Sequence, residues 1–387
     1  MSALLPALTS LLAAVFALML LDQWRERRHG FQLVWAFGML CYALGAGAEA
    51  LAATDGWTEP LYRAWYLTGA IWTAGWLGLG TAFLLGRTRF GYTYAVLLLF
   101  GAFITFVIRN SPSYAGAGVL PFLYLFGGII LSLAIGVETY FTNPRWTWFA
   151  GGAMLVVTVL SIVVVAANPP LAPGYSVSAT TGQPTGEAMP GVVRLLTPLP
   201  NITGGGALLL GALFSAYVFM PKKRVLGYSL DPDQPGDQFL FNLCIAVVAI
   251  PVNLVASLPG AVRALLAGRL HSRVPATLLI ALGAFFPTLT DSLNRAGSTN
   301  FYQLGKFLGV LFLFAGFLVS VEVFREIRIP FTSIRLATAN RERARRRDAS
   351  ADAEVPEPVP PPGSAPPPGA TPPPREAQPG TGSGHTG

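Results

Sequence analysis

The chain has 387 residues, of which 52% are hydrophobic and only 12% are charged, and its mean hydropathy is +0.53. Soluble domains carry about twice that charged fraction, roughly 25%, and several apolar runs approach the ~20 residues that cross a bilayer core. The composition excludes an ordinary soluble domain and predicts an all-α, polytopic membrane helix bundle.

The basic excess has a topological explanation. The net charge is +7, and 23 of the 26 basic residues are Arg, since only three are Lys. In a soluble protein this excess would suggest nucleic acid, but here the basic residues fall between apolar runs and after the last one, as the positive-inside rule expects. Cys41 and Cys244 lie in apolar runs without metal-ligand or disulfide spacing. We therefore expect neither a nucleic-acid partner nor a metal site.

The first 224 residues contain seven apolar runs that we interpret as membrane spans. They cover approximately residues 4–21, 31–53, 61–85, 92–107, 120–140, 149–167 and 204–220. The first run has no basic residues before it and no cleavage site after it, so we expect a retained span and not a signal peptide. Basic residues after the first, third, fifth and seventh runs predict a cytoplasmic side for those connections and an N-terminus outside the cell.

Three more apolar runs cover residues 239–258, 275–290 and 305–324. If all three crossed, the basic residues after the last run would lie outside the cell, against the positive-inside rule. The run 239–258 contains Pro251 and Asn253 and is followed by Pro259-Gly260. We therefore expect about nine transmembrane helices plus one re-entrant or interfacial segment.

The C-terminal region divides into a basic part and a Pro-rich part. Residues 333–347 have the pattern of a basic juxtamembrane helix, a kind of segment that binds anionic lipid headgroups. Its lipid-contacting candidates are Arg341, Arg343, Arg345, Arg346 and Arg347. Residues 348–387 are rich in Pro and Gly without an apolar pattern, which predicts a disordered tail that a cytoplasmic protein could recognise. The expected units are 1–224, 225–332, 333–347 and 348–387.

Two Pro-interrupted runs carry candidate residues for ligand binding or transport. Pro251 and Pro287 are each followed by polar side chains. Broken helices expose backbone groups that bind ions or substrates in transporters, whereas prolines also kink ordinary membrane helices. Asp291 and Arg295 lie four residues apart on one helix face, either as a structural clasp or as the lining of a pocket for a zwitterionic or polar ligand. The candidates are Asn253, Asp291, Asn294 and Arg295.

A second group of candidates lies in the second and third runs. Glu49 and Arg63 are near the outer ends of these runs, and we expect them to pair, because one partner buried alone would cost several kcal/mol. A role in binding a proton or a ligand is the alternative. Trp65, Trp72 and Trp76 are spaced by seven and four residues, which predicts one aromatic face. That face could clamp a flat apolar ligand such as a quinone or carotenoid, or form an interfacial belt.

The last apolar run and the missing motifs bear on mechanism. Gly305, Gly309 and Gly316 permit close helix contact. Lys306 lies at the edge of the run, so we do not expect a retinal Schiff base. H-E-x-x-H, G-x-S-x-G and G-K-[ST] are absent from the sequence. We predict no catalytic residue, and the sequence indicates no cofactor.

Residues 1–224 resemble the seven-helix membrane sensor region that precedes the kinase part of some bacterial histidine kinases. The resemblance rests on the short first run, the basic RERRHG turn, and the pair FQLVWAFGMLCYALGAGAEALAA and LYRAWYLTGAIWTAGWLGLGTAFLL. The chain departs from that pattern where a kinase or PAS domain should begin, because it returns to the membrane there. The resemblance implies sensing or ligand binding without an output activity.

The sequence therefore predicts a non-enzymatic sensor, ligand-binding or scaffold protein of the bacterial inner membrane, with its N-terminus outside and its C-terminus in the cytoplasm. A small-solute or ion transporter that uses broken helices around Pro251 and Pro287 is the first alternative. A membrane enzyme is the second.

Overall fold

The computed structural model describes residues 3–114, 116–167, 171, 188–229, 236–267, 269–271, 273–295, 301–320, 326–328, 330–331 and 335–338. Almost all of this part of the chain is helical. Ten of its helical stretches are long and apolar enough to cross a membrane. The predicted all-α, polytopic membrane fold is confirmed.

The helices follow the predicted runs closely. The first unit contains α1 (Leu4–Arg27), α2 (Gly30–Asp55), α3 (Glu59–Trp65), the π-helix η1 (Tyr66–Trp72), α4 (Thr73–Leu84), α5 (Phe90–Ile108), the 3-10 turn η2 (Pro112–Tyr114), α6 (Leu120–Tyr140), α7 (Trp146–Ala167), α8 (Gly191–Arg194) and α9 (Pro198–Phe219). It is followed by α10 (Gly236–Leu266), α11 (Arg273–Arg295) and α12 (Tyr302–Val319). The stretch α3–η1–α4 forms one continuous span.

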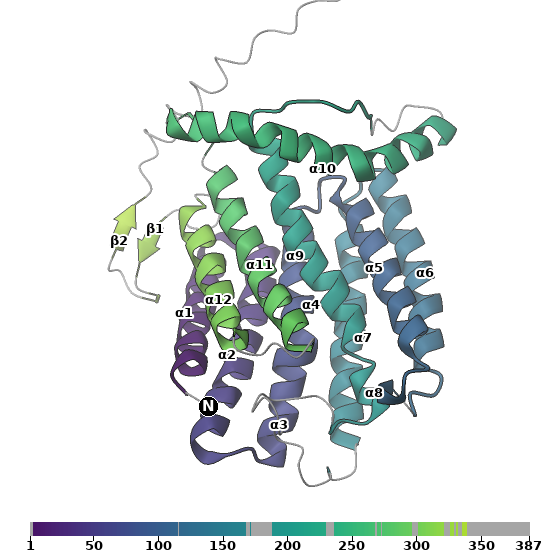
Figure 1. Cartoon of the computed structure of the whole chain (residues 1–387), viewed down its shortest axis with the longest axis vertical. Coiled ribbons are helices and arrows are strands. Elements are labelled where there is room, and N and C mark those ends of the chain that lie inside the picture. The colour runs from purple at the N-terminus through teal and green to yellow at the C-terminus, as the bar shows by residue number, and fades with distance from the viewer. Residues whose placement is uncertain are drawn as a thin grey trace, which may run out of the picture.

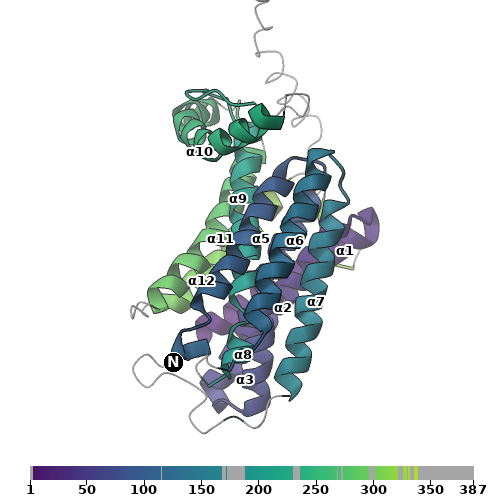
Figure 2. The same cartoon turned by 90° about the vertical axis from the view of Figure 1, so that its right-hand side faces the viewer.

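Helix α10 differs from the other long helices in its direction. It lies across one end of the bundle, while the other apolar helices run along the bundle axis (Figures 1 and 2). Taking α10 from the ten apolar helices of the described chain leaves nine that run in the crossing direction. This count agrees with the prediction of about nine crossings, with α10 as the additional segment. The N-terminus lies at the end of the bundle opposite α10 (Figure 1).

Small residues bring the crossing helices together. A Cβ atom placed on Gly78 of α4 would come within 2.1 Å of the Gly204 carbonyl oxygen of α9. Large apolar side chains instead cover the outside of the bundle, and Ile130 and Leu133 of α6 are 70% and 65% exposed. This arrangement is typical of a membrane protein, because lipid tails are as apolar as a leucine side chain and helix association depends on close packing.

The α11–α12 pair uses the same kind of contact. A Cβ atom on Gly305 would lie 2.1 Å from the Thr290 hydroxyl oxygen, and one on Gly309 would lie 2.2 Å from the Pro287 ring. A Cβ atom on Gly316 would lie 2.7 Å from the Ala276 carbonyl oxygen of α11. The predicted close contact through these glycines is confirmed, and it joins α11 and α12 into a hairpin that packs on α1 and α9.

A short β-hairpin follows α12. Strands β1 (Glu326–Arg328) and β2 (Arg335–Thr338) pair antiparallel. Residues 335–338 of the predicted juxtamembrane helix 333–347 are therefore extended and pair with β1. The five lipid-contacting arginines and the 348–387 tail lie outside the described residues.

The hairpin turn is attached to α1. The Phe331 N–H donates to Asp22 Oδ1 at 3.2 Å. The Arg25 guanidinium carbon lies 5.3 Å from the centre of the Phe331 ring. The segment that leaves α12 therefore touches the end of the first helix.

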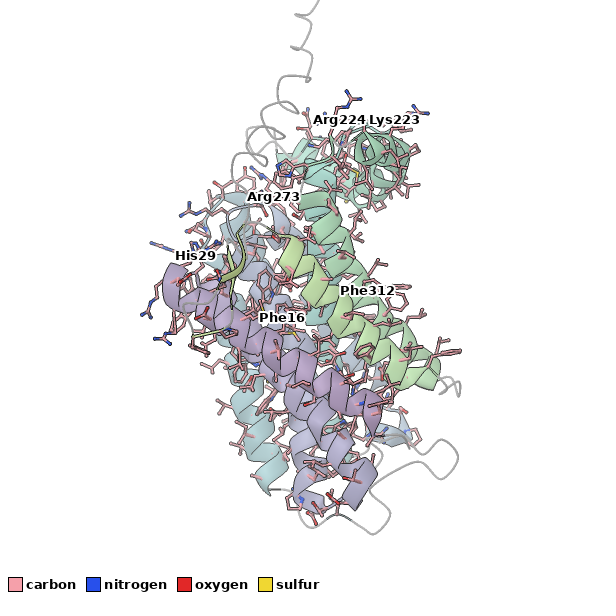
Figure 3. All side chains as sticks on the ribbon, turned by 90° about the vertical axis from the view of Figure 1, so that its left-hand side faces the viewer. Phe16, His29, Lys223, Arg224, Arg273 and Phe312 are labelled. Atoms are coloured by element: carbon pink, nitrogen blue, oxygen red, sulfur yellow. The ribbon has the colours of Figure 1, made fainter. Side chains whose placement is uncertain are left out.

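The basic connections gather at one end. His29, Lys223, Arg224 and Arg273 lie in the half of the molecule that ends in α10, whereas Phe312 lies midway along the bundle (Figure 3). Lys223, Arg224 and Arg273 therefore place positive charge near the α10 end of the bundle.

Candidate functional site

The clearest candidate site surrounds the carboxylate of Glu49 on α2, whose side chain is 2% exposed. Its Oε1 accepts hydrogen bonds from Lys306 Nζ of α12 at 2.6 Å and from Trp65 Nε1 of α3 at 2.8 Å. Its Oε2 accepts one from Gln303 Nε2 of α12 at 3.0 Å. We call these four residues the Glu49 cluster.

The Glu49 cluster places opposite charges inside an apolar bundle. Ionisable side chains among membrane helices are expensive and mark functional sites by default. The Lys306 side chain is 16% exposed, so both ions of the pair are largely removed from solvent. Removing one partner from such a pair leaves an uncompensated buried charge. The Glu49–Lys306 ion pair is therefore stable while both charges are present, and loss of either charge alone is strongly unfavourable.

The first turns of α12 are held on α2 at a second point. Tyr42 Oη donates to the Lys306 carbonyl oxygen at 2.8 Å. Tyr42 and Glu49 lie seven residues apart, so they share one face of α2. That face receives the beginning of α12, and the contact joins the seven-helix unit to the last span.

Arg63 does not contribute to this pair. It forms an ion pair with Glu59 one turn earlier on α3, at 2.6 Å, and it also donates to the Val165 carbonyl of α7. The predicted Glu49–Arg63 pair is therefore wrong. Because Trp65 faces Glu49, Arg63, two positions before it on the same helix, points to the other side.

A seven-residue π-helix, η1, follows Trp65 directly. Such segments are rare and are frequently found at functional sites. Its displaced carbonyls have partners, since Thr73 Oγ1 donates to Thr68 O at 2.7 Å and Asn201 Nδ2 of α9 donates to Ala70 O at 2.9 Å. The segment also packs tightly on α2, where a Cβ atom on Gly45 would lie 2.9 Å from Gly69 Cα. The irregular backbone therefore lies one turn of α2 from Glu49.

The three tryptophans do not act as one surface. Trp65 donates to Glu49, whereas Trp72 donates to Ser161 Oγ at 2.8 Å and Trp76 to Thr158 Oγ1 at 3.2 Å, both on α7. The wider turn of η1 changes the helical phase between Trp65 and Trp72. Each indole N–H of the predicted aromatic face is bound to another helix, so the rings serve as cross-links between helices.

Asn253 is a structural clasp. Its side chain is fully buried on α10. Its Oδ1 accepts from the backbone N–H groups of Val225 and Leu226 at 2.7 and 3.0 Å, and its Nδ2 donates to the Leu226 carbonyl at 2.8 Å. Both lone pairs of the amide oxygen are used. The residue holds the segment 221–229 on α10 and offers no acceptor for a ligand.

The prolines do not break their helices. Helix α10 continues through Pro251, and α11 continues through Pro287. The expected broken segments are therefore absent from these two described helices, and ordinary membrane helices also tolerate proline. Gly309 of α12 packs against the Pro287 ring. Asp291 is partly exposed near the end of α11, while the side chains of Asn294 and Arg295 lie outside the described residues.

Sequence reasoning missed two members of the cluster, Gln303 and Lys306. Their three-residue spacing puts them on one helix face, and a carboxylate in an apolar run requires a cation. These two features could have indicated Lys306 as the partner of Glu49. The nearest cation in the sequence is Arg63, however, and Lys306 is 257 residues away.

Comparison of the chain with protein-family models, curated proteins and solved structures gives no match. The function is therefore inferred from the geometry of the Glu49 cluster.

Proposed function

We propose that this integral membrane protein is a non-enzymatic sensor whose resting state is held by the Glu49–Lys306 ion pair. The observation that carries the proposal is the 2.6 Å contact between Glu49 Oε1 and Lys306 Nζ. It joins the seven-helix unit to α12, and α12 leads into the C-terminal region. A stimulus that discharges this pair changes the attachment of α12.

A proton is the stimulus that suits the site best. The Glu49 side chain is 2% exposed, and a cavity of about 30 Å³ in the described bundle is lined by residues such as Tyr94 and Thr203, not by Glu49. Protonation of Glu49 neutralises the carboxylate and leaves the Lys306 ammonium unpaired, which favours separation of α12 from α2.

The output follows from the chain order. When the ion pair is lost, α12 keeps its glycine contacts with α11, so it can move away from α2. Movement of α12 reaches the β-hairpin, which touches α1 at Asp22. A switch needs a local charge change and an element with two arrangements. Here we assign those roles to Glu49 and α12.

Hydrogen exchange in Glu49→Gln tests this function, because glutamine mimics the protonated carboxyl. We expect backbone amides of residues 302–309 to exchange at least about tenfold faster, the equivalent of about 1.4 kcal/mol of lost local stability. Glu59→Gln is the matched control, since Glu59 is also paired, but its partner is Arg63 of the same helix and not a residue of α12. Unchanged exchange across α12 in Glu49→Gln would remove the pair from the sensing mechanism.

A small-solute or ion transporter is the second candidate. A buried carboxylate–ammonium pair in a helix bundle is also the kind of group that relays protons in transporters. The candidate site then becomes the Glu49 cluster in place of the prolines of α10 and α11. Substrate-dependent proton uptake by proteoliposomes that is abolished in Glu49→Gln would favour transport over sensing.

The proposed location is the bacterial inner membrane, with the α10 end in the cytoplasm. The basic connections at that end support this orientation. In a protein with Cys41 and Cys244 replaced, we expect an impermeant thiol reagent to label Asp55→Cys in intact cells and Arg145→Cys only after the cells are opened. The reverse pattern would invert the orientation. Recognition of the tail by a cytoplasmic partner stays a prediction.

A further inference from the structure

Helix α10 has an uncovered apolar face. Its exposed apolar residues recur every three or four positions and therefore form one stripe. The most exposed members are Phe241 at 68%, Val247 at 69%, Val255 at 64% and Leu266 at 83%. The others are Val248, Val252, Leu258, Val262 and Leu265. A stripe of this size requires a partner or an apolar medium.

The opposite face of α10 contacts the extended segment 221–229, which contains three basic residues. Asn253 and Ser257 are buried there. Ser257 Oγ accepts from the Lys223 backbone N–H at 2.9 Å, beside the Asn253 clasp on Val225 and Leu226. The side chains of Lys223 and Arg224 point away from the bundle, beyond α10 (Figure 3). We call Lys222, Lys223 and Arg224 the basic strip, and all three are exposed.

The other described helices leave the apolar stripe of α10 exposed. Its packing on the described helices is concentrated at two points. Phe239 lies against the rings of Tyr92 and Tyr140 near the start of α10, and Ala261 joins a cluster with Tyr217 and Val274 near its end. The 31 residues extend about 46 Å at ~1.5 Å per residue. Figure 2 shows the helix displaced to one side of the bundle.

We propose that α10 lies in the headgroup region of the leaflet at its end of the bundle and that the basic strip binds anionic phospholipid there. An apolar face toward the acyl chains and a basic opposite face are the features of helices that lie in a membrane interface. Basic side chains near the surface gain about a factor of five each in affinity for anionic lipid. Arg263, exposed on the flank of α10, adds a further positive charge.

The charge distribution favours lipid over a second copy of the chain. Two copies joined through their apolar stripes would bring like-charged Arg263 side chains toward one interface. A bilayer satisfies both faces of α10 together, because apolar chains and phosphate groups lie at adjacent depths.

The native thiol of Cys244 is a probe for this position, since it is exposed on the apolar stripe whereas Cys41 is buried. With Cys41→Ala in the full chain, a fluorophore is attached to Cys244 and the protein is placed in vesicles of phosphatidylcholine and phosphatidylglycerol. We expect stronger quenching by lipids with a nitroxide near the headgroup than by lipids with one at the chain end, and weak quenching by iodide. A control probe at Gly227→Cys, in Cys41→Ala/Cys244→Ser, should be quenched by iodide instead.

Three outcomes would overturn the interfacial position. Strongest quenching of the Cys244 probe by the deep nitroxide would indicate a crossing helix, and dominant quenching by iodide would indicate a stripe that faces water. Efficient Cys244–Cys244 cross-linking between copies would indicate a dimer contact.

Lipid charge is tested with a neutralised basic strip, Lys222→Gln/Lys223→Gln/Arg224→Gln. We expect the wild-type protein to enrich spin-labelled phosphatidylglycerol over phosphatidylcholine at least about threefold, and this variant to lose the preference. Arg28→Gln/Arg87→Gln/Arg145→Gln removes the same charge from other connections at the same end and should keep it. Equal loss in both variants would show a general charge effect and would overturn the assignment to the basic strip.

Discussion

Replacing Lys306 by methionine should destabilise the protein by about 3 kcal/mol, because the Glu49 carboxylate would stay buried without its ion-pair partner. Glu49→Gln should have a similar effect, since it leaves the Lys306 ammonium unpaired. The free energy of unfolding can be measured in mixed micelles by SDS titration, with helicity as the signal.

The pair itself is isolated by the double variant Glu49→Gln/Lys306→Met. The double variant should lose less unfolding free energy than the sum of the losses in the two single variants, by at least about 1 kcal/mol. The reason is that removing both charges leaves neither one buried alone. Glu59→Gln serves as the control, with an expected change below about 1 kcal/mol for its more exposed pair with Arg63. Additive single effects would show that the two side chains do not interact.

The second large effect is expected at Gly309. Alanine there should cost about 2 kcal/mol, because its Cβ atom would meet the Pro287 ring at 2.2 Å and the Gly283 carbonyl oxygen at 3.1 Å. The proline ring cannot rotate away, so α11 and α12 must separate. The same SDS titration measures the loss.

Gly127 of α6 is the matched control for Gly309. It is also inside a membrane helix, but a Cβ atom added to it would meet no atom of another described helix within 4 Å. Gly127→Ala should be neutral or stabilise by up to about 1 kcal/mol, the helix-propensity difference. If the two alanines have equal effects, close packing of α12 on α11 does not contribute to stability.

The parts of the fold that could be predicted depend on local properties of the sequence. Length and hydropathy of the apolar runs give the membrane class and the nine crossings. The prolines and basic residues around 239–258 indicate that this run does not cross, and the spacing of Gly305 and Gly309 indicates a close helix contact. Each of these features is contained in a short window of sequence.

The site depended on contacts between distant residues. Glu49 and Lys306 meet only when α12 packs on α2, so Arg63, nearer in sequence, was the natural choice of partner. The π-helix η1 also has no simple sequence signal, and it divides the expected aromatic face at Trp72. Pro251 predicted a broken helix, but α10 continues through it.

The most direct test of the central claim is the distance between α2 and α12 as Glu49 loses its charge. Spin labels at Leu51 and Leu304, both on the exposed surface, report this distance by double electron–electron resonance in a protein with Cys41 and Cys244 replaced. We predict one short distance at neutral pH, a second and longer one at low external pH, and the longer one at every pH in Glu49→Gln. A distance distribution that is the same under all of these conditions would contradict the Glu49–Lys306 pair as the switch.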